Sequence, residues 1–248
     1  MVKGLDTFQK YFADYEEQYV LIGGAACDIL FESNEVNFRA TRDLDMVLIV
    51  EALTPEFGEK FWRFIVDGKY RNKATNGSNP QFYRFNKPED DNFPKMIELF
   101  CRSDFKLKDA KGITPIYIDD EVSSLSAILL NDDYYKALLN GKEVRKGLSV
   151  LRPEYIILFK AKAYLDLKKQ KDLGKKVDSS DIKKHKKDVL RIASELMLEK
   201  VEELPIAVDV DIHSFIDLLE QEPFDQNSLK RYGLKNEDIV ELLKQVFG

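Results

Sequence analysis

Apolar residues follow two different periodicities along the chain, and the change between them divides it into two parts. Up to about residue 150, short apolar runs of strand length stand between amphipathic stretches. Beyond Pro153, apolar residues recur at the spacing of helices. The sequence therefore predicts an α+β protein with two domains, residues 1–150 and residues 151–248.

The elements follow from the same pattern. In the first part, the sequence predicts helices at 5–15, 25–31 and 55–67, and strands at 19–22, 43–50, 81–85 and 96–102. Residues 71–80 and 86–92, which are rich in Asn, Gly, Pro or acidic side chains, predict loops. In the second part, it predicts helices at 154–171, 181–200, 212–219 and 236–246. Ser179 and Ser180 supply N-cap chemistry for the second of these helices.

Asp43-Leu44-Asp45 stands at the start of a strongly apolar run that ends at Val50. A strand puts residues i and i+2 on the same face, so the two carboxylates project side by side. Carboxylates held this close repel each other unless a cation lies between them, and oxygen ligands suit Mg²⁺. The branched apolar residues that follow are typical of a strand buried on both faces. The pair indicates a metal site on a rigid strand, and a solvated strand end is the alternative.

Gly23-Gly24 follows the strand predicted at Tyr19–Ile22 and precedes a helical stretch that begins at Ala25. Paired glycines at such a junction let the backbone approach a ligand, and the exposed amides of a helix start favour phosphate. A plain tight turn is the alternative. The acidic pair about twenty residues later favours the phosphate interpretation.

Glu98 interrupts an otherwise apolar strand that ends at Cys101. A lone glutamate in a buried strand is costly unless it is paired or bound to metal. Glu98 is therefore the candidate third carboxylate of a two-metal site. An edge strand with Glu98 facing water is the alternative.

Positive charge is concentrated in the second part of the chain. Residues 158–191 contain eleven Lys and one Arg against five Asp, in a protein whose net charge is −6. Such a segment attracts a triphosphate or a nucleic-acid backbone, or forms only a solvated helix face.

Lys160 follows the apolar run Tyr155–Phe159, so we expect its stem to be packed and its ammonium group to reach a cleft. Lys184 and Asp188 are four residues apart and therefore lie on one face of a predicted helix. They form either a simple salt bridge or part of a site in which Asp188 orients a lysine. His185 beside them either bonds a phosphate or base, or lies on the surface.

These segments together resemble the polymerase-β nucleotidyltransferase superfamily. Within it, the chain is most similar to the AbiEii/AbiGii-type branch, named after abortive-infection and toxin–antitoxin proteins. That branch combines a glycine-rich turn, an R-x-T-x-D-[IL]-D segment and a later strand carboxylate, which correspond to Gly23-Gly24, Arg39–Asp45 and Glu98. Its helical half carries a lysine and a basic-x-x-x-Asp motif, matched here by Lys160 and by Lys184–Asp188.

The resemblance spans roughly residues 19–192 and implies a nucleotidyltransferase-like mixed β-sheet flanked by helices, followed by a helical C-terminal region. It implies an Mg²⁺-dependent enzyme, with two ions, that moves an NMP from an NTP to an acceptor hydroxyl. The acceptors in the family are a tRNA end, a protein or a small molecule. A toxin role, and with it an antitoxin protein as partner, is a further implication.

The site residues implied by the resemblance form two sets. The catalytic and metal-binding residues would be Asp43, Asp45 and Glu98. The nucleotide-binding residues would be Gly23, Gly24, Thr41, Lys160, Lys184 and Asp188. Many superfamily members have Gly-Ser in place of Gly23-Gly24, so triphosphate binding here must rely on backbone amides and lysines. Two alternatives stay open: a non-catalytic nucleotide- or RNA-binding module on the same fold, and a phosphotransferase that uses the same metal site.

No apolar run approaches the length of about eighteen residues that a membrane span requires, and the N-terminus lacks the hydrophobic core of a signal peptide. Cys27 and Cys101 both stand among apolar residues and predict buried thiols, which indicates a reducing compartment. The sequence has no Cys and His spacing typical of zinc sites. We therefore expect a cytoplasmic protein with no membrane contact.

Overall fold

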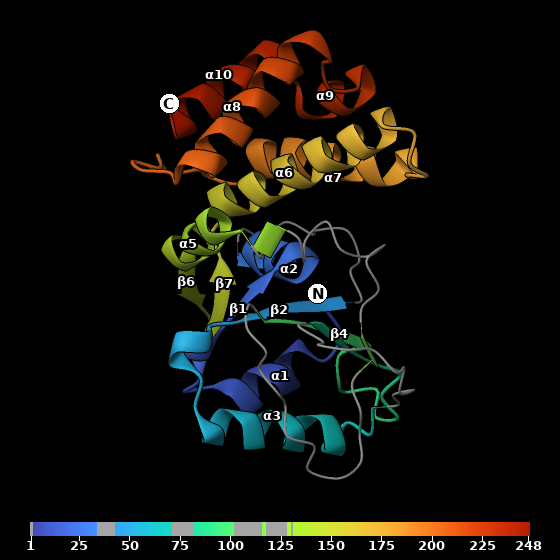
Figure 1. Ribbon diagram of the computed structural model, residues 1–248, viewed down its shortest axis with the longest axis vertical. Helices are drawn as coiled ribbons and strands as arrows, with labels where there is room; N and C mark the ends of the chain where they lie inside the picture. The colour runs from blue at the N-terminus through green and yellow to red at the C-terminus, as the bar shows by residue number, and fades with distance from the viewer. Residues whose placement is uncertain (1, 34–42, 71–81, 102–115, 118–127, 130) are drawn as a thin grey trace. The chain divides into compact units, whose positions relative to one another are not determined.

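The structure, a computed structural model, describes residues 2–33, 43–70, 82–101, 116–117, 128–129 and 131–248. This part of the chain is α+β, with a mixed sheet flanked by helices (Figure 1). It separates into two compact units, which are Met1–Ser126 with Lys142–Leu151, and Ala127–Gly141 with Arg152–Gly248. We refer to them as the sheet unit and the helical unit.

The sheet unit contains the strands β1 (Tyr19–Ile22), β2 (Asp43–Leu48), β3 (Phe82–Asn86), β4 (Met96–Cys101), β5 (Ile116–Tyr117), β6 (Lys142–Arg145) and β7 (Leu148–Leu151). Their order across the sheet is β5-β3-β4-β2-β1-β7-β6. β2 runs parallel to β4 and antiparallel to β1, and β1 runs parallel to β7. β2 therefore lies in the interior of the sheet, as the apolar residues that follow Asp45 predict.

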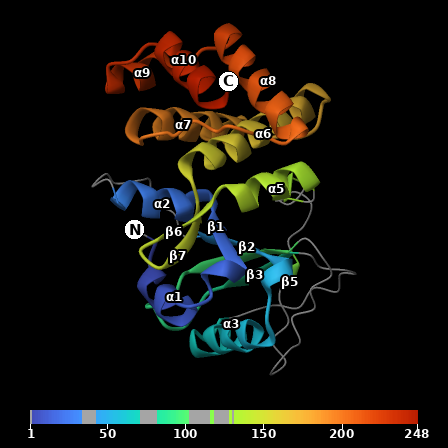
Figure 2. The same cartoon turned by 90° about the vertical axis from the view of Figure 1, so that its left-hand side faces the viewer.

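The helices that flank this sheet are α1 (Leu5–Phe12), α2 (Gly23–Ser33) and α3 (Pro55–Asp67). α1 and α3 lie on one side of the sheet and α2 on the other (Figures 1 and 2). Phe8 of α1 meets Tyr19 of β1 and Phe64 of α3 edge-on, with ring centroids 5.5 and 5.7 Å apart. Edge-on aromatic pairs of this kind add to the free energy of burial. The aromatic core thus lies on the α1 and α3 side.

Tyr15, expected within the first helix, lies beyond its end.

The helical unit contains α5 (Asp132–Asn140), α6 (Pro153–Asp172), α7 (Ser179–Glu195), α8 (Ile206–Gln221), α9 (Gln226–Tyr232) and α10 (Asn236–Phe247). α6 packs along α7, and α8 packs against both α6 and α10. The N-cap of α7 is Asp178, whose side chain accepts a hydrogen bond from the N–H of Ser180 at 2.8 Å. The sequence predicted the cap at Ser179 and Ser180, which instead begin the helix. An aspartate just before them takes the capping position.

The β6–β7 hairpin, α5, α9 and the short β5 were not predicted from the sequence. The hairpin turns at Lys146 and Gly147, whose φ angles are 50° and 69°. Two consecutive positive φ angles are the geometry of the tight turns that match the twist of paired strands. Lys-Gly is a weaker signal for such a turn than Asn-Gly, because lysine rarely adopts a positive φ.

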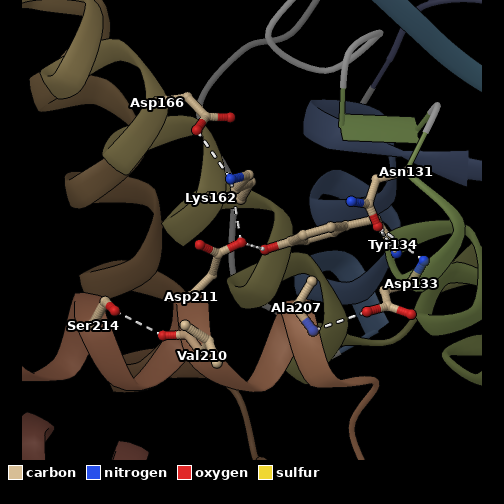
Figure 3. A network of polar contacts seen from close by, with 9 residues as sticks. All are labelled: Asn131, Asp133, Tyr134, Lys162, Asp166, Ala207, Val210, Asp211 and Ser214. Atoms are coloured by element: carbon tan, nitrogen blue, oxygen red, sulfur yellow. Dashed lines mark hydrogen bonds and ion pairs between the residues drawn. The ribbon is translucent and has the colours of Figure 1, made fainter.

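A polar network ties α5 to the other helices of its unit (Figure 3). The Tyr134 hydroxyl donates to Asp211 Oδ2 at 3.0 Å, and Lys162 Nζ lies 3.2 Å from the same oxygen. The N–H of Ala207 donates to Asp133 Oδ2 at 2.8 Å. These contacts join α5 to α6 and α8. The sequence-based boundary at residue 150 differs from this division, because α5 belongs to the helical unit although the β6–β7 hairpin follows it in the chain.

Tyr134→Phe is expected to lower the free energy of unfolding by about 1–2 kcal/mol, because Asp211 loses a hydrogen bond in a largely buried place. Burial, and the nearby Asp211 carboxylate, raise the pKa of Tyr134, so its hydroxyl stays a donor and the loss should be the same throughout neutral pH. Urea unfolding measures the effect. Tyr11→Phe, which removes the more exposed bond to Asp67 in the sheet unit, is the control and should cost less. Equal losses would mean that the network contributes no more than a surface bond.

Cys27 of α2 and Cys101 of β4 are both buried, and no disulfide joins them. This agrees with the thiols expected from the sequence. Within the described ranges, none of the helices combines the length and the apolar character needed to cross a membrane.

Candidate functional site

Three charged side chains lie in register on three neighbouring strands of the sheet. Asp45 of β2 is opposite Glu98 of β4, and Glu98 is opposite Arg84 of β3. Residues opposite each other on neighbouring strands project from the same face, so the three form one line, which we call the charged row. Phe85, next to Arg84, packs against Phe61 of α3. Because successive residues point to opposite faces, the charged row lies on the face away from α3.

Asp43 is the first residue of β2 and projects from the same face as Asp45, two residues before it. The residue opposite Asp43 on β4 is Met96, which lies two residues before Glu98 and on the same face of the sheet. Asp43 and Asp45 are both half-buried. The structure therefore places the two carboxylates side by side at the beginning of an interior strand.

Glu98 is held by Arg84. Its Oε1 accepts hydrogen bonds from Arg84 Nε at 2.9 Å and from Arg84 Nη2 at 2.5 Å. Only 9 % of Glu98 is exposed, so an unpaired carboxylate there would carry a large desolvation cost, which the guanidinium group offsets. Arg84 therefore explains how a glutamate is tolerated in an apolar strand.

The expected three-carboxylate metal group is not formed in the part of the chain that the structure describes. There, no set of three or more Asp, Glu, His or Cys side chains is placed to hold a metal ion. The side chains of Asp43 and Asp45 have the oxygen donors that Mg²⁺ prefers. Glu98 is engaged with a guanidinium group instead. Asp43 and Asp45 supply suitable ligands for one Mg²⁺ ion, and the second ion stays a prediction.

Gly23 begins α2 and lies directly against Asp45. Its φ is +62°, in the left-handed region, and a Cβ there would lie 2.2 Å from Asp45 Oδ2. Both facts require glycine at this position. The Asp45 carboxylate thus lies at the start of α2, where the unpaired amides of a helix favour negative charge. Gly24 is buried as the second residue of the helix.

Gly23→Ala is expected to destabilise the sheet unit in two ways. The left-handed backbone costs about 1–2 kcal/mol for any residue with a Cβ, and the methyl group must also displace the Asp45 carboxylate. Gly174→Ala is the matched control, because Gly174 has φ +78° and nothing lies within 4 Å of its Cβ position. The free energy of unfolding should therefore fall further in Gly23→Ala.

The comparison is completed in an Asp45→Ala background. In that background, Gly23→Ala should lower the free energy of unfolding by little more than Gly174→Ala does. The reason is that Asp45→Ala has already removed the carboxylate that the new methyl group would displace. If the additional loss of unfolding free energy is unchanged in that background, the Asp45 carboxylate does not lie against Gly23.

In the helical unit, the structure brings together Lys160 and Asp188. Lys160 Nζ of α6 lies 3.0 Å from Asp188 Oδ2 of α7, and both residues are buried. Lys184, one turn before Asp188, is exposed, and His185 is half-buried. Asp188 therefore pairs with Lys160 of the neighbouring helix, and a role of this pair in a nucleotide site stays a prediction. The packed stem expected for Lys160 is present, and its ammonium group is bound to Asp188.

One predicted site residue lies outside the described part of the chain, and one charged residue of the site was not predicted. Thr41, expected to bind nucleotide, lies outside the described residues, as do Arg39 and Arg42. Arg84 was not singled out from the sequence. Its signal was present, since it is a charged residue within an otherwise apolar and aromatic strand, and pairing that strand with β4 across the predicted 86–92 loop puts Arg84 beside Glu98.

Neither a family model nor a curated protein sequence matches the chain. The resemblance to nucleotidyltransferases therefore rests on the motif residues and on the chemistry of their surroundings.

Proposed function

We propose that this protein is an Mg²⁺-dependent nucleotidyltransferase, with a nucleotidyltransferase-like fold in its sheet unit, which moves an NMP from an NTP to an acceptor hydroxyl. The observation that carries this proposal is the position of Asp45. Its carboxylate lies against Gly23 at the start of α2, beside Asp43 on the same strand and Glu98 on the next.

At this position, the start of a helix, which attracts anions, lies next to a pair of aspartates. The amides at the start of α2 attract phosphate, while Asp43 and Asp45 repel it. A triphosphate can occupy this place only if a cation neutralises the two carboxylates. The arrangement therefore favours a ligand that arrives as a metal–phosphate complex, and NTP is the common ligand of that kind.

Asp43 and Asp45 would hold Mg²⁺, which when bound supplies positive charge for the triphosphate and for charge that develops on it. Gly23 and Gly24 would donate backbone N–H groups to phosphate oxygens, in place of the hydroxyl that the Gly-Ser form of the motif provides. Glu98, fixed through its Oε1 by Arg84, would accept the proton of the acceptor hydroxyl at Oε2.

The helical unit would contribute positive charge. Lys160, oriented by Asp188, and the exposed Lys184 are proposed to neutralise charge on the leaving pyrophosphate. Because Asp188 already balances the charge of Lys160, Lys184 would carry the larger share of the attraction at long range.

A labelling experiment tests the proposal. The protein is incubated with Mg²⁺, with each NTP labelled at the α or the γ phosphate, and with total RNA or cell lysate. Transfer of the α label supports nucleotidyl transfer and identifies the acceptor as RNA, protein or small molecule. Transfer of the γ label alone would identify a phosphotransferase instead. Nucleotide binding without transfer would identify a binding module.

A further inference from the structure

A pocket of about 590 Å³ lies within the helical unit, between α6, α7 and the segment that joins α8 to α9. Its wall is formed partly by the apolar side chains of Ile182, Leu190 and Phe224. The volume falls in the range of about 300–1,000 Å³ that is usual for small-molecule sites. The pocket shares no residue with the acidic site of the sheet unit.

Cationic side chains dominate the polar lining of this pocket. Its lysines are Lys168, Lys171, Lys183, Lys186 and Lys187, and its acidic residues are Asp172, Glu222 and Asp225. Two of the acidic residues are already occupied. Lys168 Nζ lies 2.5 Å from Glu222 Oε1, and Asp225 caps α9 by accepting from the N–H of Ser228 at 2.9 Å. Five lysines stand against three carboxylates, so the lining has a net positive charge.

Lys186 binds backbone carbonyl groups at the end of α8. Its Nζ donates to the backbone carbonyls of Glu222 and Pro223, the latter at 3.2 Å, where α8 ends. The ammonium also lies 5.7 and 5.4 Å from the ring centroids of Tyr164 and Phe224. A cation at the end of a helix is stabilised by the unpaired carbonyls. Burial lowers the pKa of Lys186, which agrees with this packed position.

The other lysines of the lining make fewer contacts with the protein. Lys183 and Lys187 are exposed and stand one turn apart on α7, where like charges repel each other. Neither ammonium forms a salt bridge within the described ranges, but Lys187 lies near Asp225: hydrogen bonds from Ser228, and after them the charge of Lys187, lower the pKa of that carboxyl. Lys171, at the end of α6, donates to the Ser179 hydroxyl at 2.7 Å, and both residues line the pocket. Lys171, Lys183 and Lys187 thus line the same pocket as the apolar residues.

We propose that this pocket binds a nucleoside phosphate unit, with its phosphate on Lys171, Lys183 and Lys187 and its base against the apolar wall. A phosphate offers several strong acceptor oxygens to several ammonium groups at once, and a base offers a flat, largely apolar surface. An acidic peptide carries single charges on separate side chains and matches this arrangement less well. A free nucleotide and the terminal nucleotide of an RNA share the same chemistry.

Calorimetry with the full-length chain tests the proposal. AMP is titrated in EDTA, since the proposed site in the sheet unit requires metal and triphosphate. The double variant Lys183→Glu/Lys187→Glu should weaken AMP binding at least tenfold. Lys175→Glu/Lys176→Glu is the matched control, because it makes the same charge change at exposed residues outside the pocket lining. The control should bind AMP within twofold of the wild type.

Further titrations fix the class of ligand. Inorganic phosphate and adenosine should each bind at least tenfold more weakly than AMP. A five-nucleotide RNA that binds more tightly than AMP, with the same dependence on Lys183 and Lys187, would assign the pocket to an RNA end. Equal binding would assign it to free nucleotides.

The proposal is overturned if neither AMP nor the RNA binds, if phosphate alone binds as well as AMP, or if both lysine pairs have equal effects. Because the readout is binding in EDTA, a failure of the label-transfer experiment leaves this test unchanged.

Discussion

Asp45→Asn is expected to reduce the transfer of α-labelled NMP by a factor of about 10²–10³ or more, since such losses follow when one charged group of a catalytic site is removed. The amide keeps the shape of the side chain but loses the charge that would hold Mg²⁺. Asp43→Asn should behave in the same way. The measurement is the initial rate of label transfer at saturating NTP and millimolar Mg²⁺.

Glu56→Gln is the control for this pair, because it neutralises an exposed carboxylate on α3, on the other side of the sheet. It should leave the rate unchanged. Mg²⁺ should also raise the melting temperature of the wild type by binding the folded state, and raise that of Asp45→Asn much less. Full transfer activity in Asp45→Asn would contradict the proposed function. An unchanged rate in both Asp43→Asn and Asp45→Asn would exclude any catalytic role for the pair.

Asp188→Ala is expected to lower the free energy of unfolding of the helical unit by about 3–5 kcal/mol, because it leaves the buried ammonium of Lys160 without its partner. The double variant Lys160→Met/Asp188→Leu replaces the pair by apolar side chains of similar size and should recover most of that loss. Denaturant unfolding of the two variants and the wild type measures the difference.

Asp181→Ala is the control on the same helix, since this aspartate is exposed in the first turn of α7. Only its interaction with the helix amides is lost, which is worth about 0.3–1 kcal/mol. A double variant as unstable as Asp188→Ala would show that the pair is required for the packing of α6 against α7. A small loss in Asp188→Ala would mean that Lys160 finds another partner or reaches water.

The local pattern of residues was sufficient to locate most elements. The strands β1, β2 and β4 and the helices α3, α6 and α10 lie within a few residues of their predicted ranges. Each has a strong signal of its own, such as the branched apolar run of β2 or the Pro55 start of α3 after Thr54. The shorter elements β5 and α9 were missed, because two to seven residues contain too little periodicity.

The sequence by itself also located Asp43 and Asp45 on one face of an interior strand, because the alternation of a strand depends only on residue number. It identified Lys160 as a packed lysine, because the apolar run Tyr155–Phe159 precedes it.

Only the tertiary structure decided which groups meet across elements. It placed Arg84 on Glu98, Asp45 against Gly23, Asp188 on Lys160, and α5 in the helical unit. These contacts join residues that are far apart in the chain, and they depend on strand order, register and helix packing. Periodicity fixes which face a side chain occupies. Which partner a side chain meets on that face depends on the free-energy cost of burying a charged group, or the unpaired amides of a helix end, without a partner. That cost arises only in the folded chain.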